Sequence, residues 1–291
     1  MSTLVETIPA AEPVGLDELV EVANLQTRRD RKYILREEDV WGLFDDIAPR
    51  VLEIDGRRSF RYESVYFDTA HRDSFLGAAH RRPRRFKVRT RTYLDSGECL
   101  LEVKVRDHRG NTVKHRQPHE LGSRWHLSTA AVAYISRIGA AAPFANDLRP
   151  ALEVCYLRST LLLASAGRVT VDRAVTWTGI DKAPAIVGGI AIVETKSAGP
   201  PTEVDRKLWL TGHRPSSISK YCTGLAAIEP GLPSNQWHRV LQRRILPNLR
   251  VGGLAALPDA DLPRHTHGRF TADSQLQQTN SPHAKQTADR R

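Results

Sequence analysis

The sequence predicts an α+β fold in which eight strands form a barrel or a sandwich and several helices flank them. Segments with a period of two residues dominate the chain, and helical segments alternate with them only occasionally. Of the 291 residues, 40% are hydrophobic and 26% are charged, so a sizeable core is expected and a wholly disordered or fibrous chain is excluded.

The composition divides the chain into three parts. Residues 1–14 form a polar, flexible leader, and residues 15–248 form one folded domain, which opens with a short helix between Leu16 and Leu25. Residues 249–291 are rich in Gly, Pro, His, Gln, Thr and Ser and contain too few apolar residues to anchor a core. We therefore expect a disordered tail.

Eight segments have the alternation of half-buried strands, and five have helical spacing. The predicted strands are Gln26–Leu35, Ser59–Asp68, Arg84–Tyr93, Glu98–Arg106, Thr112–Gln117, Ala151–Ser159, Arg168–Val175 and Gly189–Lys196. The predicted helices are Glu37–Ala48, Ser128–Ile138, Thr202–Thr211, Ser216–Ile228 and Asn235–Leu246. Ser128, Ser216 and Asn235 are predicted N-caps, and Thr202 with Asp205 is predicted to form a capping box.

The charge balance predicts an anionic partner. Lys and Arg number 43 against 33 Asp and Glu, a formal charge of +10. The three cysteines, Cys99, Cys155 and Cys222, are widely spaced and indicate neither a disulfide framework nor a zinc site, which favours a reducing compartment. No transmembrane or secretory segment is evident, so a cytoplasmic location is expected. The sequence does not predict an oligomeric state.

The polar faces of the predicted strands carry the most information, because residues i, i+2 and i+4 of a strand share one face. Four strands place charged residues on a single face in this way. These sets are Arg85, Lys87, Arg89 and Arg91; Glu98, Glu102, Lys104 and Arg106; Glu194 and Lys196; and Arg28, Asp30 and Lys32. Each face taken alone is equally compatible with ordinary exposure to solvent.

The recurrence of Arg and Lys on these faces favours an inward orientation, in which the strands line a tunnel. Because unpaired buried cations cost several kcal/mol each, such an interior requires a polyanion such as a triphosphate or a longer phosphate chain. The interleaved acids then favour a divalent cation, Mn²⁺ or Mg²⁺, with Glu194 as the first candidate ligand and Glu102 as the second. The alternative for each acid is an ion pair, with Lys196 and Lys104 respectively.

Seven strings of the sequence, in order, resemble the VTC domain of polyphosphate polymerases, members of the triphosphate tunnel metalloenzyme or CYTH-like superfamily. They are RRDRKY at 28–33, SVYFDT at 64–69, FKVRTRTY at 86–93, LLEVK at 100–104, VDR at 171–173, VETK at 193–196 and SKYC at 219–222. The resemblance implies an eight-stranded antiparallel β tunnel, a closed barrel, with flanking helices. It also implies a transferase that binds ATP with a metal and passes phosphate to inorganic polyphosphate.

Site residues follow from the resemblance position by position. The implied phosphate ligands are Lys32, Arg89, Arg91, Lys104, Lys114, Arg158 and Lys220, with Lys87, Lys196, Arg28 and Arg173 as further substrate-binding candidates. Glu194 matches the metal-binding glutamate of the family, and Ser219 precedes the tunnel lysine as it does there. Tyr33 and Tyr221 are assigned to packing.

One departure from the superfamily bears on the reaction. Hydrolytic tunnel enzymes usually begin with an ExExK strand, whereas this chain has Arg28 and Asp30 in the glutamate positions before Lys32. Fewer metal-binding acids favour a polymerase over a tripolyphosphatase or nucleoside triphosphatase, which stays the first alternative. The second is a non-catalytic module that binds polyanions or nucleic acid, indicated by the pI of about 9.8. The interleaved acids and an expected shortage of aromatic side chains on the same faces argue against nucleic acid.

Overall fold

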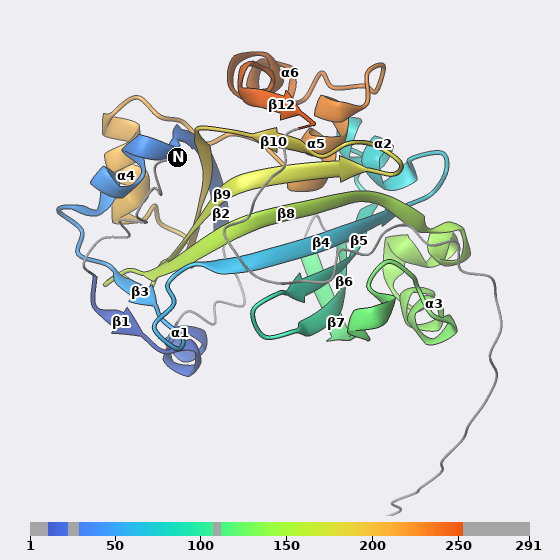
Figure 1. Cartoon of the computed structure of the whole chain (residues 1–291), viewed down its shortest axis with the longest axis horizontal. Helices are drawn as coiled ribbons and strands as arrows, with labels where there is room; N and C mark the ends of the chain where they lie inside the picture. The colour runs from blue at the N-terminus through green and yellow to red at the C-terminus, as the bar shows by residue number, and fades with distance from the viewer. Residues whose placement is uncertain (1–10, 23–28, 107–111, 253–291) are drawn as a thin grey trace, which may run out of the picture. The chain divides into compact units, whose positions relative to one another are not determined.

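The computed structural model describes residues 11–22, 29–106 and 112–252. Its strands are β1 (Pro13–Val14), β2 (Arg29–Arg36), β3 (Arg50–Leu52), β4 (Phe60–Asp68), β5 (Arg85–Tyr93), β6 (Glu98–Arg106), β7 (Thr112–Pro118), β8 (Arg149–Leu162), β9 (Arg168–Gly179), β10 (Ala185–Val187), β11 (Ile190–Ser197) and β12 (Leu249–Val251). Its helices are α1 (Leu16–Val22), α2 (Asp73–Ala79), α3 (Thr129–Ile135), α4 (Glu203–Leu210), α5 (Lys220–Ile228) and α6 (His238–Val240). Figure 1 shows β4, β8 and β9 running side by side through the fold.

The eight predicted strands all form and pair in the order β2, β11, β9, β8, β4, β5, β6, β7, with every neighbouring pair antiparallel. The predicted closed, eight-stranded barrel is nevertheless wrong. The sheet has 12 strands, and among the described residues no strand pairing joins β7 to β2. The α+β class and the antiparallel sheet with flanking helices are confirmed.

The four additional strands are two or three residues long. β1 pairs in parallel with β3, β3 pairs with β8, and β10 lies between β9 and β12. Strands this short show no alternation in the sequence, which is why the period-two pattern does not predict them. The first and last of them lie outside the predicted domain limits of 15 and 248, and those limits stay a prediction.

The helices agree with the sequence in part. Ser128 caps α3, and Thr202 and Asp205 form the capping box of α4, as predicted. The segment predicted as a helix over 37–48 forms two 3₁₀ helices, Glu37–Asp39 and Trp41–Phe44. The cap predicted at Ser216 is wrong, because Ser219 caps α5.

The predicted helix Asn235–Leu246 also differs from the one in the structure. It begins as α6 with Trp237 in the N-cap position predicted for Asn235, and it continues as a π-helical turn over Leu241–Ile245. Helix α2 is not predicted. Its first turn depends on Asp68, which accepts hydrogen bonds from the backbone N–H groups of Ser74 and Phe75 at 2.8 and 2.9 Å.

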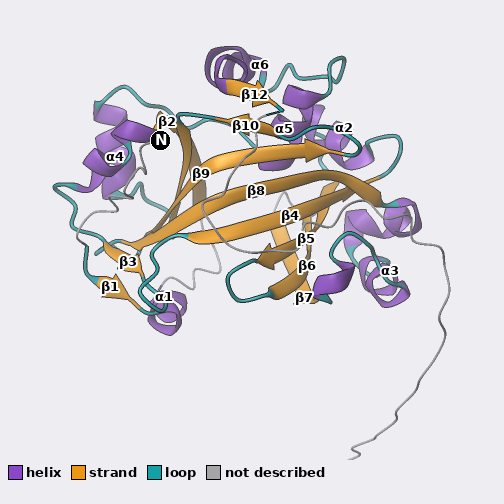
Figure 2. Cartoon of the chain, in the orientation of Figure 1, coloured by secondary structure: helices purple, strands orange, loops and turns teal. Residues whose placement is uncertain are grey.

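The two faces of the sheet are covered differently (Figure 2). On one face, the 3₁₀ helix at 41–44 and α4 cover β2, β9 and β11, and α3 with the 3₁₀ helix Gly139–Asp147 covers β4, β5 and β6. On the other face, α2, α5 and the helical segment that follows Trp237 pack on an apolar cluster that contains Tyr66, Tyr156 and Trp177. The rest of this second face carries charged side chains. In the described part of the chain, no helix is long and apolar enough to cross a membrane.

Candidate phosphate-binding site

Charged side chains from seven strands and from the start of α5 gather on the second face of the sheet. Strand register makes many of them direct neighbours: Glu194 lies opposite Lys32, Glu102 opposite Arg89, Lys104 opposite Lys87 and Lys114, and Arg158 opposite Asp172. We call this set the cationic cluster. Its members are Lys32, Lys87, Arg89, Arg91, Lys104, Lys114, Arg158, Lys196 and Lys220, with the acids Glu102, Asp172 and Glu194.

Glu194 on β11 lies between two lysines. One carboxylate oxygen is 3.1 Å from Lys32 Nζ, and the other accepts a hydrogen bond from Lys196 Nζ at 2.5 Å. Burial raises the pKa of Glu194, but the charges of Lys196 and Lys32 outweigh burial and hold that pKa well below its usual range. The carboxylate is therefore ionised at neutral pH.

Glu102 on β6 has the same kind of environment at the other side of the cluster. It accepts hydrogen bonds from Arg89 Nε and Nη2 at 2.7 and 2.5 Å, and it forms an ion pair with Lys114. Burial opposes ionisation, yet the charges of Arg89, Arg91 and Lys114 lower the pKa of Glu102. The alternative considered for Glu102 was an ion pair with Lys104, and the partners that the structure gives it are Arg89 and Lys114.

Asp172 on β9 is the acid that the sequence analysis does not single out. Its carboxylate accepts hydrogen bonds from Arg158 Nε and Nη2 at 2.6 and 2.8 Å, and it also pairs with Lys220 at the start of α5. The side chain is 1% exposed, and despite burial the two cations lower its pKa. The sequence does contain a signal for Asp172, because this acid follows the apolar Val171 in a predicted strand. Its neighbour on the adjacent strand, Arg158, is already a candidate phosphate ligand.

Three tyrosines lie beneath the arginines, which corrects the expectation that these faces lack aromatic side chains. Tyr66 Oη accepts a hydrogen bond from Arg89 at 2.7 Å, and Tyr156 Oη accepts one from Arg91 at 3.0 Å. The Arg158 guanidinium lies 5.1 Å from the ring centroid of Tyr62. Since Tyr66 and Tyr156 are buried, these rings orient the guanidinium groups and offer little surface on which a nucleic-acid base could stack.

The start of α5 completes the cluster. Ser219 caps this helix, and its hydroxyl accepts a hydrogen bond from Lys87 Nζ at 2.9 Å. Lys220 Nζ lies 4.5 Å from the ring centroid of Tyr156. Tyr221, the next residue, donates a hydrogen bond to Asp68, the same carboxylate that begins α2. The predicted packing role of Tyr221 agrees with its burial.

Of the predicted substrate ligands that the structure describes, one does not lie in the cluster. Arg28 lies outside the described residues. Arg173 lies on the opposite face of the sheet, where its guanidinium is 5.7 Å from the ring centroid of Trp41 and 3.4 Å from Glu37. A β-bulge between β8 and β9 adjoins this position, and Ala174 has a positive φ of 49°. The other predicted ligands lie together.

Several lysines of the cluster hold their protons weakly. Burial lowers the pKa of Lys196 to about 8, and burial followed by the charges of Lys87 and Lys32 lowers the pKa of Lys104 to about 8. The influence of Lys32 on Lys104 shows that β2 and β6 bring charge to one region. Lys114 also has a pKa lowered to about 8, mainly by burial. By composition, the cluster as defined above has nine cationic side chains and three acids, so positive charge is in excess there.

The residues of the cluster fit a divalent cation. Glu194 and Glu102 are ionised oxygen donors within a region that favours phosphate, and Mn²⁺ and Mg²⁺ are commonly held by one or two carboxylates together with substrate phosphates. Either acid would exchange a lysine or arginine contact for the metal.

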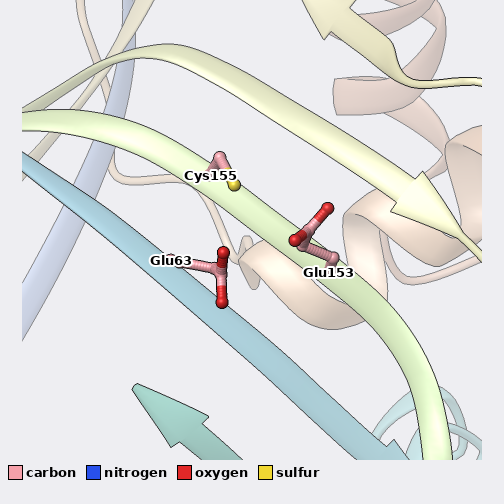
Figure 3. A group of neighbouring side chains, drawn as sticks. All are labelled: Glu63, Glu153 and Cys155. Carbon is pink, nitrogen blue, oxygen red and sulfur yellow. The ribbon is translucent and has the colours of Figure 1, made fainter. Parts of the chain in front are cut away.

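A separate acidic group lies on the opposite face. Figure 3 shows Glu63 of β4 near Glu153 and Cys155 of β8, with possible ligand atoms within 4.8 Å of one another. Arg124 donates a hydrogen bond to Glu63 at 2.7 Å. Burial and then the charge of Glu63 raise the pKa of Glu153 to about 7. This group is a possible metal site, but it does not include either predicted ligand.

Comparisons with known proteins bear on the family. The model of the VTC domain family matches residues 27–229. Among curated proteins the sequence has no match. Solved structures with similarity include a putative adenylyl cyclase from Hippeastrum described as having a dominant triphosphatase activity, at 15% identity, covering 69% of this chain and 97% of that chain with a TM-score of 0.45.

Two further structures are similar over a comparable length. The PH1819 protein from Pyrococcus horikoshii has 11% identity and a TM-score of 0.40, and covers 66% of this chain and 91% of that chain. The inorganic triphosphatase NE1496 has 12% identity and a TM-score of 0.28, and covers 68% of this chain and 95% of that chain. The family model spans most of the described residues and the strands that carry the cationic cluster, and on that match this chain belongs to the VTC domain family.

Proposed function

We propose that the protein is a polyphosphate polymerase that transfers the γ-phosphate of ATP to a growing inorganic polyphosphate chain. The observation that carries the proposal is the excess of cations in the cluster, where Glu102, Asp172 and Glu194 are all ionised and already paired. A bound polyanion would supply the missing negative charge through charge-assisted hydrogen bonds. Membership of the VTC domain family supports this substrate class.

Positioning and charge stabilisation would do most of the catalytic work. Phosphoryl transfer has a loose transition state with charge on its equatorial oxygens, so guanidinium and ammonium groups lower the barrier by lying against those oxygens. Arg89, Arg91 and Arg158 are already oriented by tyrosines and carboxylates, and Lys32, Lys104, Lys114 and Lys220 add further positive charge. The acceptor is a terminal phosphate that is ionised at neutral pH, so no dedicated general base is required.

Glu194 and Glu102 would hold Mn²⁺ or Mg²⁺ against the phosphates. When bound, the metal neutralises charge on the phosphate oxygens and brings donor and acceptor together. The ion-pair partners of these acids support the assignment. As the metal binds, Lys196 and Lys32 could move from Glu194 to the phosphates, and Arg89 and Lys114 could move there from Glu102.

The strand chemistry favours transfer to a chain over hydrolysis. Each of Glu102, Asp172 and Glu194 is engaged by two cations, so none of the three is positioned as a free base that would activate a water molecule. In hydrolytic tunnel enzymes the corresponding strand usually has two acids before its lysine. In the described part of this motif, only one acid, Asp30, precedes Lys32 on β2. The tripolyphosphatase is therefore the second candidate.

The test is to incubate the purified protein with ATP and Mn²⁺ and to separate the products by length. Long inorganic polyphosphate is the expected product, and free phosphate alone would indicate the triphosphatase. The Arg91→Ala variant should lose about 10²–10³ in rate, the typical cost of one transition-state donor. Arg243→Ala, an exposed arginine of the segment after α6, is the control and should keep its rate. Full turnover by Arg91→Ala contradicts the proposed role, and tight ATP binding without any turnover supports the non-catalytic module.

A further inference from the structure

Two buried hydroxyl groups on the second face of the sheet have no hydrogen-bond partner in the part of the chain that the structure describes. They belong to Thr170 on β9, which is 3% exposed, and to Ser64 on β4, which is 1% exposed. A buried hydroxyl without a partner costs free energy, so each group needs a ligand or an ordered water to complete it. Neither residue is among the phosphate or metal ligands described above.

Strand register gives these two hydroxyls different neighbours. Thr170 lies directly opposite Glu194 on β11, the first candidate metal ligand, and Lys32 flanks Glu194 on its other side. The Cβ atoms of directly opposite residues in antiparallel strands are about 4.5–5.5 Å apart, so the Thr170 hydroxyl and the Glu194 carboxylate can contact the same small ion. Ser64 lies opposite Arg91, which would repel a metal cation there.

Acidic residues gather around Thr170. Asp172 shares its strand face two residues further along β9. Asp30 on β2 lies opposite Lys196 on β11, two residues beyond Glu194 on the same face. Three carboxylates, from β2, β9 and β11, therefore come to the region of this one hydroxyl, and together they favour a cation there.

The second candidate metal ligand, Glu102, has a less suitable environment. Its direct neighbours on the adjacent strands are both cations, Arg89 on β5 and Arg116 on β7, and Lys114 pairs with it as well. A divalent cation at Glu102 would therefore meet positive charge on each side. Thr170 instead offers an uncharged oxygen, and Mg²⁺ in phosphate-binding sites commonly accepts a serine or threonine hydroxyl as a ligand.

We propose that the Thr170 hydroxyl is a ligand of the divalent cation held by Glu194, Mn²⁺ or Mg²⁺, between β9 and β11. The inference rests on the proposed function, because it adds one uncharged ligand to the metal site described there. It also gives this buried hydroxyl the partner that the described protein groups do not supply.

The first test measures the affinity for Mn²⁺ of the protein loaded with inorganic tripolyphosphate, by electron paramagnetic resonance of the free ion. Thr170→Val removes the hydroxyl and keeps the shape of the side chain. It should weaken Mn²⁺ binding about 10-fold, a typical cost of losing a group that supports a metal site. Thr170→Ser keeps a hydroxyl and should recover most of the affinity. Ser64→Ala removes the other unpartnered hydroxyl and should leave Mn²⁺ binding unchanged.

The second test replaces the oxygen with sulfur, because thiolates prefer a soft cation such as Cd²⁺. With Thr170→Cys, added Cd²⁺ should produce a thiolate-to-cadmium charge-transfer absorption beyond that of the wild-type protein, which has three cysteines of its own. Ser64→Cys is the matched control. It introduces a thiol on the same sheet face with no carboxylate directly opposite, and should add no such absorption.

The inference is overturned if Thr170→Val binds Mn²⁺ like the wild type, if Thr170→Ser recovers nothing, or if Thr170→Cys adds no cadmium absorption. Tripolyphosphate binding in EDTA should be the same in Thr170→Val and wild type, which also shows that the variant is folded. An equal loss there would mean that the hydroxyl contacts phosphate and not the metal. The cadmium test uses neither ATP nor polyphosphate, so it judges Thr170 even if product analysis refutes the polymerase.

Discussion

At the scale of single residues, Asp172 has the largest structural consequence in the cationic cluster. It is the only carboxylate of the cluster that joins a strand to α5, through Arg158 on β8 and Lys220 at the helix start. Its side chain is 1% exposed, so water cannot replace it as a partner for those cations. Removing one member of such a buried group leaves uncompensated charge, which costs more than the ion pair itself contributes.

Replacing Asp172 with Asn should therefore destabilise the protein by about 3 kcal/mol, measured as the free energy of unfolding in urea. Asp46→Asn is the matched control, because Asp46 pairs with Lys207 at 3.0 Å but has a side chain that is 85% exposed. That exposed pair should contribute less than about 1 kcal/mol. Equal effects of the two substitutions would show that Asp172 is not the partner on which Arg158 and Lys220 depend.

The sequence predicts those site residues whose strand face follows from the alternation of side chains along a strand. Lys32, Arg89, Lys104 and Glu194 lie in the cluster because a period of two residues places them there. Arg173 directly follows Asp172, which lies in the cluster, so plain alternation places it on the other face. The bulge beside it depends on pairing between distant strands, so the sequence of one strand does not reveal it.

At the scale of elements, α5 determines how much of the second face stays polar. Its residues Tyr221, Cys222 and Leu225 join the apolar cluster, while Lys220 at its N-terminus reaches the cations. Close approach of this helix to β9 requires Gly224. A β-carbon at that position would lie 2.3 Å from Nε1 of the buried Trp177, which is closer than any real contact.

Gly224→Ala should lower stability by about 2 kcal/mol, because a small-to-large change in a packed core costs about 1–3 kcal/mol. Alanine favours a helix over glycine by about 1 kcal/mol, so a gain in stability would show that packing is not limiting. Polyphosphate affinity should fall too, since Lys220 shifts with the helix. Thermal unfolding and titration calorimetry measure the two effects. Gly188→Ala, where a β-carbon meets nothing within 4 Å, is the control.

The elements that could be predicted are those with long repeating patterns. The eight strands extend over seven to 14 residues and their alternation is clear. Helix α2 is seven residues long and starts only because Asp68, at the end of β4, accepts its first N–H groups. Among the described residues the sheet is not closed by pairing of β2 with β7. The sequence does not predict this, because closure depends on the spatial relation of two distant strands and no local pattern encodes it.

At the scale of the whole molecule, the cationic cluster gathers nine Lys and Arg side chains and three acids in a chain whose formal charge is +10. Helices cover the apolar parts of both sheet faces, and the cationic cluster occupies the remainder. The pKa values of Lys104, Lys114 and Lys196 are each lowered to about 8, mainly because these ammonium groups are buried. A polyanion would raise all three by favouring the charged ammonium.

Binding of a polyanion should therefore be coupled to proton uptake. Each of these lysines is charged below pH 8 and neutral above it, so affinity for polyphosphate should fall about 10-fold or more between pH 7 and pH 9. Near pH 8, binding should take up about one proton or more, and near pH 6 almost none. Calorimetry in HEPES and Tris, buffers with different ionisation enthalpies, measures the uptake directly.

A medium-length polyphosphate is the appropriate ligand for this measurement, because its interior phosphates stay ionised throughout the range and contribute no protons of their own. Lys114→Met should reduce the uptake at pH 8, since it removes one titrating ammonium from the side of the cluster formed by β7. Lys182→Met removes a lysine that is 44% exposed and pairs with Glu229, and should leave the uptake unchanged. Identical binding heats in the two buffers at pH 8 would mean that these lysines are already fully protonated in the free protein, and the cluster would then not be short of counter-charge.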